Sequence, residues 1–172
     1  MLTLENNYIA IDIDEKYGGK ITRLENRISQ YDWVWFSNEK RKDFKPVEYS
    51  DYDAQWIGGY EELFPNDKIE PLGGNLAPDH GELWSSKWEV VDENDDSLQL
   101  RCNGYFSKSV IQKTFKLQEN KVKVYYEINN IKLDKFLFKL HLAMPINKTS
   151  IEFKFTSFKK VDKKFGNIIS NN

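Results

Sequence analysis

The sequence has only one cysteine, Cys102, and two histidines, His80 and His141, among its 172 residues. A single cysteine excludes an internal disulfide and a cysteine metal cluster. Two histidines without a His-x-Glu-x-His-type spacing do not form a typical zinc site. The sequence also lacks a GxxxxGK phosphate loop and a GxSxG nucleophile elbow. We therefore expect neither a metal nor another cofactor.

Long apolar runs and an excess of one charge are also missing. No apolar run approaches the roughly 18 residues that span a bilayer, and the N-terminal MLTLENNYIA does not resemble a signal peptide. The formal net charge of −2 gives no bulk attraction to nucleic acid or anionic membranes. Lysines near the C-terminus lack the interleaved aromatic residues of an RNA-binding surface, which favours a solvated tail. These features predict a cytoplasmic protein that binds neither nucleic acid nor a membrane.

The residues that are present favour one β-rich domain. The length suits a single core, and the aromatic fraction of 15% suits sheet surfaces better than helical bundles. Apolar and polar residues alternate over short stretches separated by turn residues, which is typical of an antiparallel sandwich or barrel. The predicted strands are 8–14, 21–26, 31–36, 87–93, 97–106, 110–118, 121–130 and 135–146. Residues 37–46 are predicted to be a solvated loop, and no helix of ordinary length is expected.

Residues 55–88 have a different composition, with five glycines and three prolines. This excludes a long helix, and long irregular segments in compact domains are usually functional or disordered. Because the segment is also rich in Trp and Phe, we expect an ordered, functional loop region.

Aromatic and acidic side chains within this segment form the first candidate site. Aromatic faces next to carboxylates suit a sugar, which has apolar C–H faces and hydroxyl edges. The alternative is a surface loop whose tryptophans cap the sheet. The candidate sugar-contacting residues are Trp56, Glu61, Asp79, His80, Glu82 and Trp84.

His141 is the second candidate. Alternation in KFLFKLHLAMPI places it on the same strand face as Lys139 and Ala143, opposite Leu140 and Leu142. We expect the leucines to face the core and His141 to face away, either into a concave binding face or into solvent.

These segments together resemble the galactose mutarotase-like superfamily, which includes the aldose 1-epimerases. YGGKITRLENR is similar to the opening hairpin of the family and YDWVWF to its next strand. GGYEELFPN resembles the Gly-Gly…Phe-Pro motif, DHGELW the His-Gly motif, and YEINNIKLDKFLFKLHLAMPI the segment that carries the second histidine. The resemblance runs in order from about residue 8 to 147.

The resemblance implies a truncated β-supersandwich that binds an aldose and interconverts its α and β anomers by ring opening. It also implies that His141 is the acid that protonates the ring oxygen, a role that suits histidine. His80 would hold and polarise the sugar oxygens. Trp56, Ile57, Leu83 and Trp84 stand where relatives often carry arginine. An unphosphorylated sugar is therefore expected, because phosphate recognition favours Arg.

One part of the family pattern has no counterpart. The catalytic base of the family is a glutamate near the C-terminus of a longer chain, and no residue here matches it. The sequence thus resembles the N-terminal half of the fold, with a domain over 1–155 and a basic, polar tail over 156–172. The alternatives are a truncated epimerase, a non-catalytic carbohydrate-binding protein, or a homo-oligomer that covers exposed sheet edges and supplies the glutamate from its partner.

Overall fold

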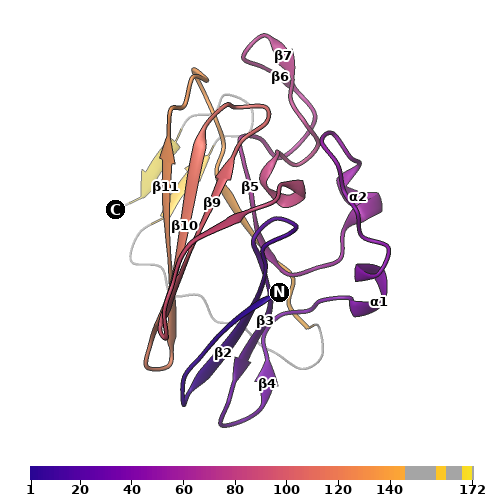
Figure 1. The fold of residues 1–172 in the computed structure, drawn as a ribbon. Coiled ribbons are helices and arrows are strands. Elements are labelled where there is room, and N and C mark those ends of the chain that lie inside the picture. Colours follow the sequence, from indigo (N-terminus) through magenta and orange to yellow (C-terminus); the bar gives the residue numbers. More distant parts are fainter. Residues whose placement is uncertain (146–157, 162–167, 172) are drawn as a thin grey trace.

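Two antiparallel sheets pack face to face in the computed structural model, which describes residues 1–145, 158–161 and 168–171 (Figure 1). The first sheet has the order β1-β2-β3-β5-β12, and β4 also pairs with β3. These strands are β1 (Leu2–Glu5), β2 (Ile9–Asp14), β3 (Lys20–Asn26), β4 (Tyr31–Asp32), β5 (Tyr60–Leu63) and β12 (Lys139–Leu142). The second sheet has the order β11-β10-β9-β8. Its strands are β8 (Glu89–Glu93), β9 (Ser97–Asn103), β10 (Val110–Gln118) and β11 (Lys121–Asn129). The prediction of an all-β antiparallel sandwich is confirmed.

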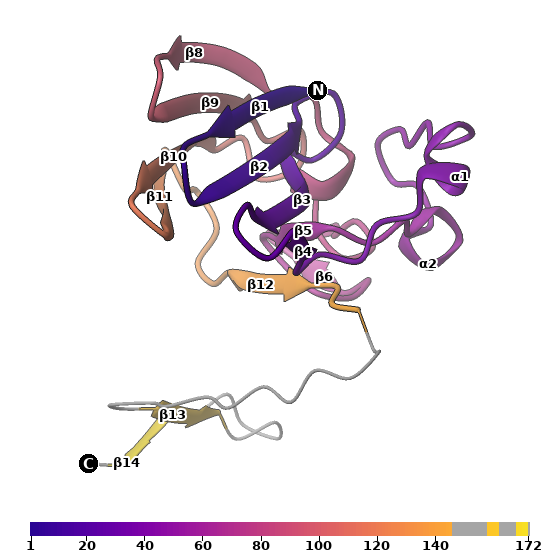
Figure 2. The same ribbon diagram turned by 90° about the horizontal axis from the view of Figure 1, so that it is seen from below.

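The remaining elements are short. They are α1 (Asn38–Arg41), α2 (Tyr52–Gln55), a 3-10 turn η1 (Leu83–Ser85), the pair β6 (Pro71–Leu72) and β7 (Asn75–Leu76), and the pair β13 (Phe158–Val161) and β14 (Ile168–Asn171). Helices α1 and α2 cover the side of the first sheet that faces away from the second sheet (Figures 1 and 2). No helix in the described part of the chain is long and apolar enough to cross a membrane. The predicted domain boundary at 155/156 lies outside the described residues.

Alternating apolar residues build the core between the two sheets. On β10, Ile111, Phe115 and Leu117 are buried and Lys116 and Gln118 are exposed, which is the period of two expected for a strand with one buried face. The core residues are Leu4, Ile11, Ile13, Ile21, Val34, Phe64, Leu83, Trp88, Leu98, Leu100, Cys102, Ile111, Phe115 and Leu117. Each large apolar side chain of this kind stabilises the fold by about 1.5–3 kcal/mol. A second cluster lies between the first sheet and the helices, and contains Phe44, Tyr52, Ile57, Leu63 and Trp84.

The central strand β5 lies in the segment that we expected to be irregular. It pairs with β3 through Ile21 and Tyr60 and with β12 along its whole length. The alternation rule missed it because two of its four residues are glutamates, both buried, and because glycines precede it and Pro65 follows it. The rest of 55–88 contains only the short β6, β7 and η1.

Two predictions about residues 31–46 are corrected. Strand β4 ends at Asp32. The Trp33 backbone N–H still donates to the Leu24 carbonyl oxygen of β3, but Trp35 then bonds to the backbone of Ala143 and Gly59 instead. Residues 38–41 form the helix α1 within the expected loop, and the Ser37 hydroxyl caps it by accepting from the Lys40 backbone N–H at 3.2 Å.

The strand at 135–146 is shorter than expected, and its two leucines, which share the face of Glu62 as predicted, are exposed instead of buried. Only Lys139–Leu142 forms β12, and Leu140 and Leu142 are 50% and 39% exposed, whereas His141 is half-buried. The reason is that β12 is a border strand whose described partner is β5 alone (Figure 2). Coverage of this edge by a second copy of the chain stays a prediction.

A buried ion pair connects the two sheets. Lys113 Nζ of β10 lies 2.6 Å from Glu62 Oε2 of β5 and 2.9 Å from the Gly19 carbonyl oxygen, and Tyr126 OH donates to Glu62 Oε1. Both charged side chains are 1% exposed or less. Burial lowers the pKa of Lys113, although the charge of Glu62 opposes this shift. Breaking an ion pair this deeply buried is costly, because removal of one partner leaves the other charge buried without a counter-charge.

We expect Lys113→Met to lower the free energy of unfolding by about 3–5 kcal/mol, because Glu62 then loses its counter-charge. The double variant Lys113→Met/Glu62→Gln should recover part of this loss, since it no longer buries an unpaired carboxylate. Urea unfolding measures both effects. Lys116→Met, on the exposed face of the same strand, is the control, and a Lys113→Met loss no larger than that of the control would contradict this account.

Candidate functional site

The register of the first sheet brings a charged cluster together beneath α2. His141 on β12 stands opposite Glu61 on β5, and Lys20 on β3 reaches the same carboxylate from the other side. Tyr52 of α2 completes the cluster: its hydroxyl bonds to Glu61 Oε1 and lies 2.7 Å from His141 Nδ1. The direct distance from His141 Nδ1 to Glu61 Oε1 is 3.8 Å. Tyr52 therefore bridges the histidine and the glutamate.

The Glu61 carboxylate is charged although it is buried away from solvent. Its side chain and that of Lys20 are both 1% exposed. Burial alone would raise the pKa of Glu61, but the Lys20 ammonium and the hydrogen bonds to the carboxylate outweigh burial and lower this pKa to about 2. Burial and the charge of Glu61 together raise the pKa of Tyr52, so the phenol keeps its proton. Glu61 was predicted to contact a sugar, but Tyr52 and Lys20 occupy its two oxygens.

His80 lies on the other side of Tyr52. Its ring stacks on the Tyr52 ring with centroids 4.1 Å apart and 16° between the planes. Asp79 Oδ1 lies 2.8 Å from His80 Nδ1, while Asp79 Oδ2 accepts the backbone N–H of Tyr52 at 3.0 Å. Asp79 thereby fixes both His80 and the first residue of α2.

The turn that presents His80 depends on the glycine that follows it. His80 and Gly81 have φ angles of +55° and +77°, and a Cβ on Gly81 would lie 2.3 Å from the Phe64 carbonyl oxygen. Only glycine fits so close to another backbone in this conformation. The next residues turn inward, so the structure places Glu82 and Trp84 behind the site instead of in its wall. Glu82 is fully buried, and its carboxylate accepts the backbone N–H groups of 106 and 107. Trp84 is 2% exposed and packs in the second apolar cluster.

Two tryptophans and His141 line an open hollow beside this cluster. Trp56 lies nearly parallel to the His141 ring at 6.0 Å and 19°, and Trp35 lies 5.4 Å from Trp56. The hollow has a volume of about 270 Å³, and its lining residues are Trp35, Trp56, His141, Leu142, Ala143 and Met144. Such a wall offers flat apolar faces next to one imidazole, as a sugar ring requires.

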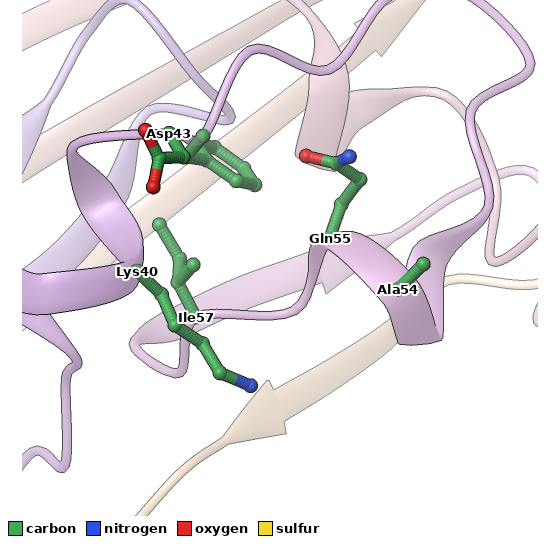
Figure 3. A pocket seen from close by; sticks show the side chains of 6 residues that line it. Lys40, Asp43, Ala54, Gln55 and Ile57 are labelled. Carbon is green, nitrogen blue, oxygen red and sulfur yellow. The ribbon is translucent and has the colours of Figure 1, made fainter.

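A second hollow lies between α1 and α2 (Figure 3). It measures about 210 Å³, and its walls include Lys40 and Asp43 on one side and Ala54 and Gln55 on the other. Neither histidine lines it. We take the hollow at His141 as the candidate site, because convergent polar groups with perturbed pKa values mark functional sites. Among the described residues, no three His, Cys, Asp or Glu side chains are grouped so that they could hold a metal ion.

The structure thus gathers His80, His141, Trp56, Asp79 and Glu61 around one residue that sequence reasoning missed, Tyr52. Trp35 and Lys20 were missed as well. A signal for Lys20 existed, since two consecutive glutamates on a buried strand require cationic partners. No comparable signal marked Tyr52, because its role follows from the position of α2 over β5.

We expect the Glu61 carboxylate to make stability depend on pH in acid. Its folded pKa of about 2 is below its ordinary value of 4.5, so the unfolded chain binds the proton more tightly. The stabilisation is present above pH 4.5 and is lost as the pH falls towards 2, by about 3 kcal/mol in total. The difference in unfolding free energy between the wild type and Glu61→Gln should therefore shrink over this window in urea titrations. The exposed Glu39→Gln is the control, and a difference that stays constant with pH would contradict this assignment.

Comparisons with known proteins agree with this fold. No family model and no curated protein match the sequence. Among solved structures, a galactose mutarotase related enzyme from Lactobacillus acidophilus superposes with a TM-score of 0.64 at 16% identity, over 97% of this chain and 59% of that one. A candidate aldose 1-epimerase from Escherichia coli K12 gives 0.53 at 17% identity, over 74% of this chain and 45% of that one.

A 4-alpha-glucanotransferase from Thermococcus litoralis gives 0.53 at 15% identity, over 94% of this chain and 28% of that one. The chain thus spans 59% or less of the length of these three proteins. At these identities the likeness concerns the fold. The resemblance noted in the sequence is confirmed at that level: the chain has a galactose mutarotase-like fold.

Proposed function

We propose that this chain binds an unphosphorylated aldose in the hollow at His141 and interconverts its anomers. The observation that carries the proposal is the placement of both histidines beside Tyr52, next to two tryptophans, in a galactose mutarotase-like fold. Trp35 and Trp56 would contact the apolar face of the sugar. None of the described residues that line this hollow is Arg or Lys, which favours a sugar without phosphate.

The chemistry is a ring opening. The anomeric hydroxyl loses its proton to water, the bond between C1 and the ring oxygen breaks, and the ring oxygen takes a proton from Nε2 of His141 in its doubly protonated form. The open aldehyde turns about the C1–C2 bond and closes on its other face. Closure returns the ring-oxygen proton to Nε2, and the anomeric oxygen regains a proton from water. His80 does not line the hollow but lies beyond Tyr52, where it would hold oxygens of a sugar that extends past Tyr52. No carboxylate is among the described residues that line the hollow, so we assign the proton of the anomeric hydroxyl to water.

We expect the chain to accelerate mutarotation of glucose or galactose, as measured by polarimetry. His141→Ala should reduce the catalysed rate by about 100-fold or more, because a positioned general acid contributes about that much. Lys139→Ala, two residues away on β12 with an exposed side chain 3.7 Å from Asp67, should keep the wild-type rate. If common aldoses mutarotate no faster with the chain than in buffer, the catalytic proposal fails.

A second function is favoured by the burial of the acidic residues. Glu61 and Glu82 are buried and closed off from the hollow. Their burial fits a carbohydrate-binding protein that holds the sugar without turning it over.

Sugar binding without turnover predicts a change in tryptophan fluorescence on titration with an aldose, with no change in the mutarotation rate. Trp56→Phe should reduce the fluorescence response, because Trp56 lines the hollow. Trp33→Phe should keep it, since Trp33 is 38% exposed and packs on Tyr31 outside the hollow. A titration without any response to sugars would contradict both functions.

A further inference from the structure

Four groups form a continuous polar chain from the core to the hollow. Lys20 Nζ donates to Glu61 Oε2, Glu61 Oε1 is bonded to Tyr52 OH, and Tyr52 OH is bonded to His141 Nδ1. The inner members are closed to solvent, since Lys20 and Glu61 are each 1% exposed and Tyr52 is 3% exposed. Only His141, with a side chain 38% exposed, reaches the surface. A ring-opening reaction would involve His141 alone. The buried Lys20, Glu61 and Tyr52 therefore need a separate explanation.

The number of available protons sets the direction of these hydrogen bonds. The Glu61 carboxylate accepts from Lys20 and can only accept from Tyr52, because an ionised carboxylate has no proton to donate. The single phenol proton of Tyr52 therefore points to Glu61. The Tyr52 oxygen is then an acceptor towards His141, and Nδ1 of His141 must carry a proton. The low pKa of Glu61 and the raised pKa of Tyr52 agree with this assignment.

From this geometry we infer that Glu61 and Tyr52 are positioning residues that hold His141 with a proton on Nδ1. Nε2 is then the ring nitrogen that exchanges a proton with a ligand in the hollow. The part that concerns sugar rests on the proposed function, whereas the tautomer of His141 does not. The stacked ring of Trp56 limits rotation of the imidazole, so the direction of Nε2 is set as well as its protonation.

The other histidine is held by a shorter version of the same arrangement. Asp79 Oδ1 lies 2.8 Å from His80 Nδ1 and accepts a hydrogen bond from an Nδ1–H group there. Both imidazoles thus have Nδ1 bonded to a described residue of the protein, and of the two only His141 lines the hollow. Around His141 the titratable groups are Tyr52 from α2 and Glu61 from β5, with Lys20 of β3 and His80 behind them.

Glu61→Gln gives the sharpest test, because it should reverse the direction of the hydrogen bonds from Glu61 through Tyr52 to His141. Lys20 will keep donating to the side-chain oxygen of the new amide, which turns the amide NH₂ group towards Tyr52. The Tyr52 oxygen then accepts from the amide and its hydroxyl donates to His141 Nδ1. The proton of neutral His141 should move from Nδ1 to Nε2.

Long-range ¹H–¹⁵N correlation spectra of ¹⁵N-labelled full chain at high pH report which ring nitrogen is protonated. We expect Nδ1–H in the wild type, Nε2–H in Glu61→Gln, and a mixture of tautomers in Tyr52→Phe, which keeps the shape of the ring. Glu62→Gln is the matched control, since this neighbour is equally buried but faces Lys113. It should leave the His141 tautomer unchanged. Tyr52→Phe decides the question if Glu61→Gln does not fold.

Rates of mutarotation separate this inference from the proposed function. Where the chain is active, Tyr52→Phe should reduce the rate by about tenfold or more and alter its pH profile, as loss of the correct histidine tautomer does in other enzymes. An Nδ1–H tautomer without any mutarotation would leave the inference standing and remove the catalytic proposal. Nε2–H in the wild type, or an unchanged tautomer in both Glu61→Gln and Tyr52→Phe, would overturn the inference even in an active chain.

Discussion

Two consecutive buried glutamates on β5 organise this molecule. Glu61 faces α2 and Glu62 faces the second sheet, because successive side chains of a strand point to opposite faces. Each carboxylate meets one lysine and one tyrosine: Lys20 and Tyr52 on one side, Lys113 and Tyr126 on the other. Buried charges persist only when they are paired and hydrogen-bonded in this way. The same four residues of backbone therefore join the two sheets and support the candidate site.

The two glutamates have different consequences. The Glu62 pair is buried beside Trp88 and the glycine turn at 18–19 and does not line the hollow, so we expect it to act on stability. The Glu61 pair is connected through Tyr52 to a histidine that reaches the surface. A charge held deep in the first sheet is thus connected by hydrogen bonds to His141, which lines the hollow, although Glu61 itself is closed off from the hollow. This arrangement places a buried, hydrogen-bonded support behind the open hollow.

Much of the fold was predictable from the sequence because alternation is a local property. The strands at 97–103, 110–118 and 121–129 were predicted to within a few residues, since each has one apolar face and turn residues at its ends. Strand β5 was missed because its buried residues are charged, so its burial depends on lysines that come from other strands. The burial of the β12 leucines was predicted wrongly for a similar reason: they lie on the expected face, but at a border where the described sandwich does not cover them.

The sequence by itself determined the all-β class, the resemblance to galactose mutarotases and the two histidines as candidates, because these depend on local patterns and on ordered motifs. Only the tertiary structure decided how the candidates are combined. It placed Tyr52 between His80 and His141, sealed Glu61 beneath it, and turned Glu82 and Trp84 away from the hollow. The physical reason is that hydrogen bonding and burial depend on strand register and on the packing of α2. These bring together residues that are far apart in the sequence: Lys20 and His141, 121 positions apart, lie on either side of Glu61.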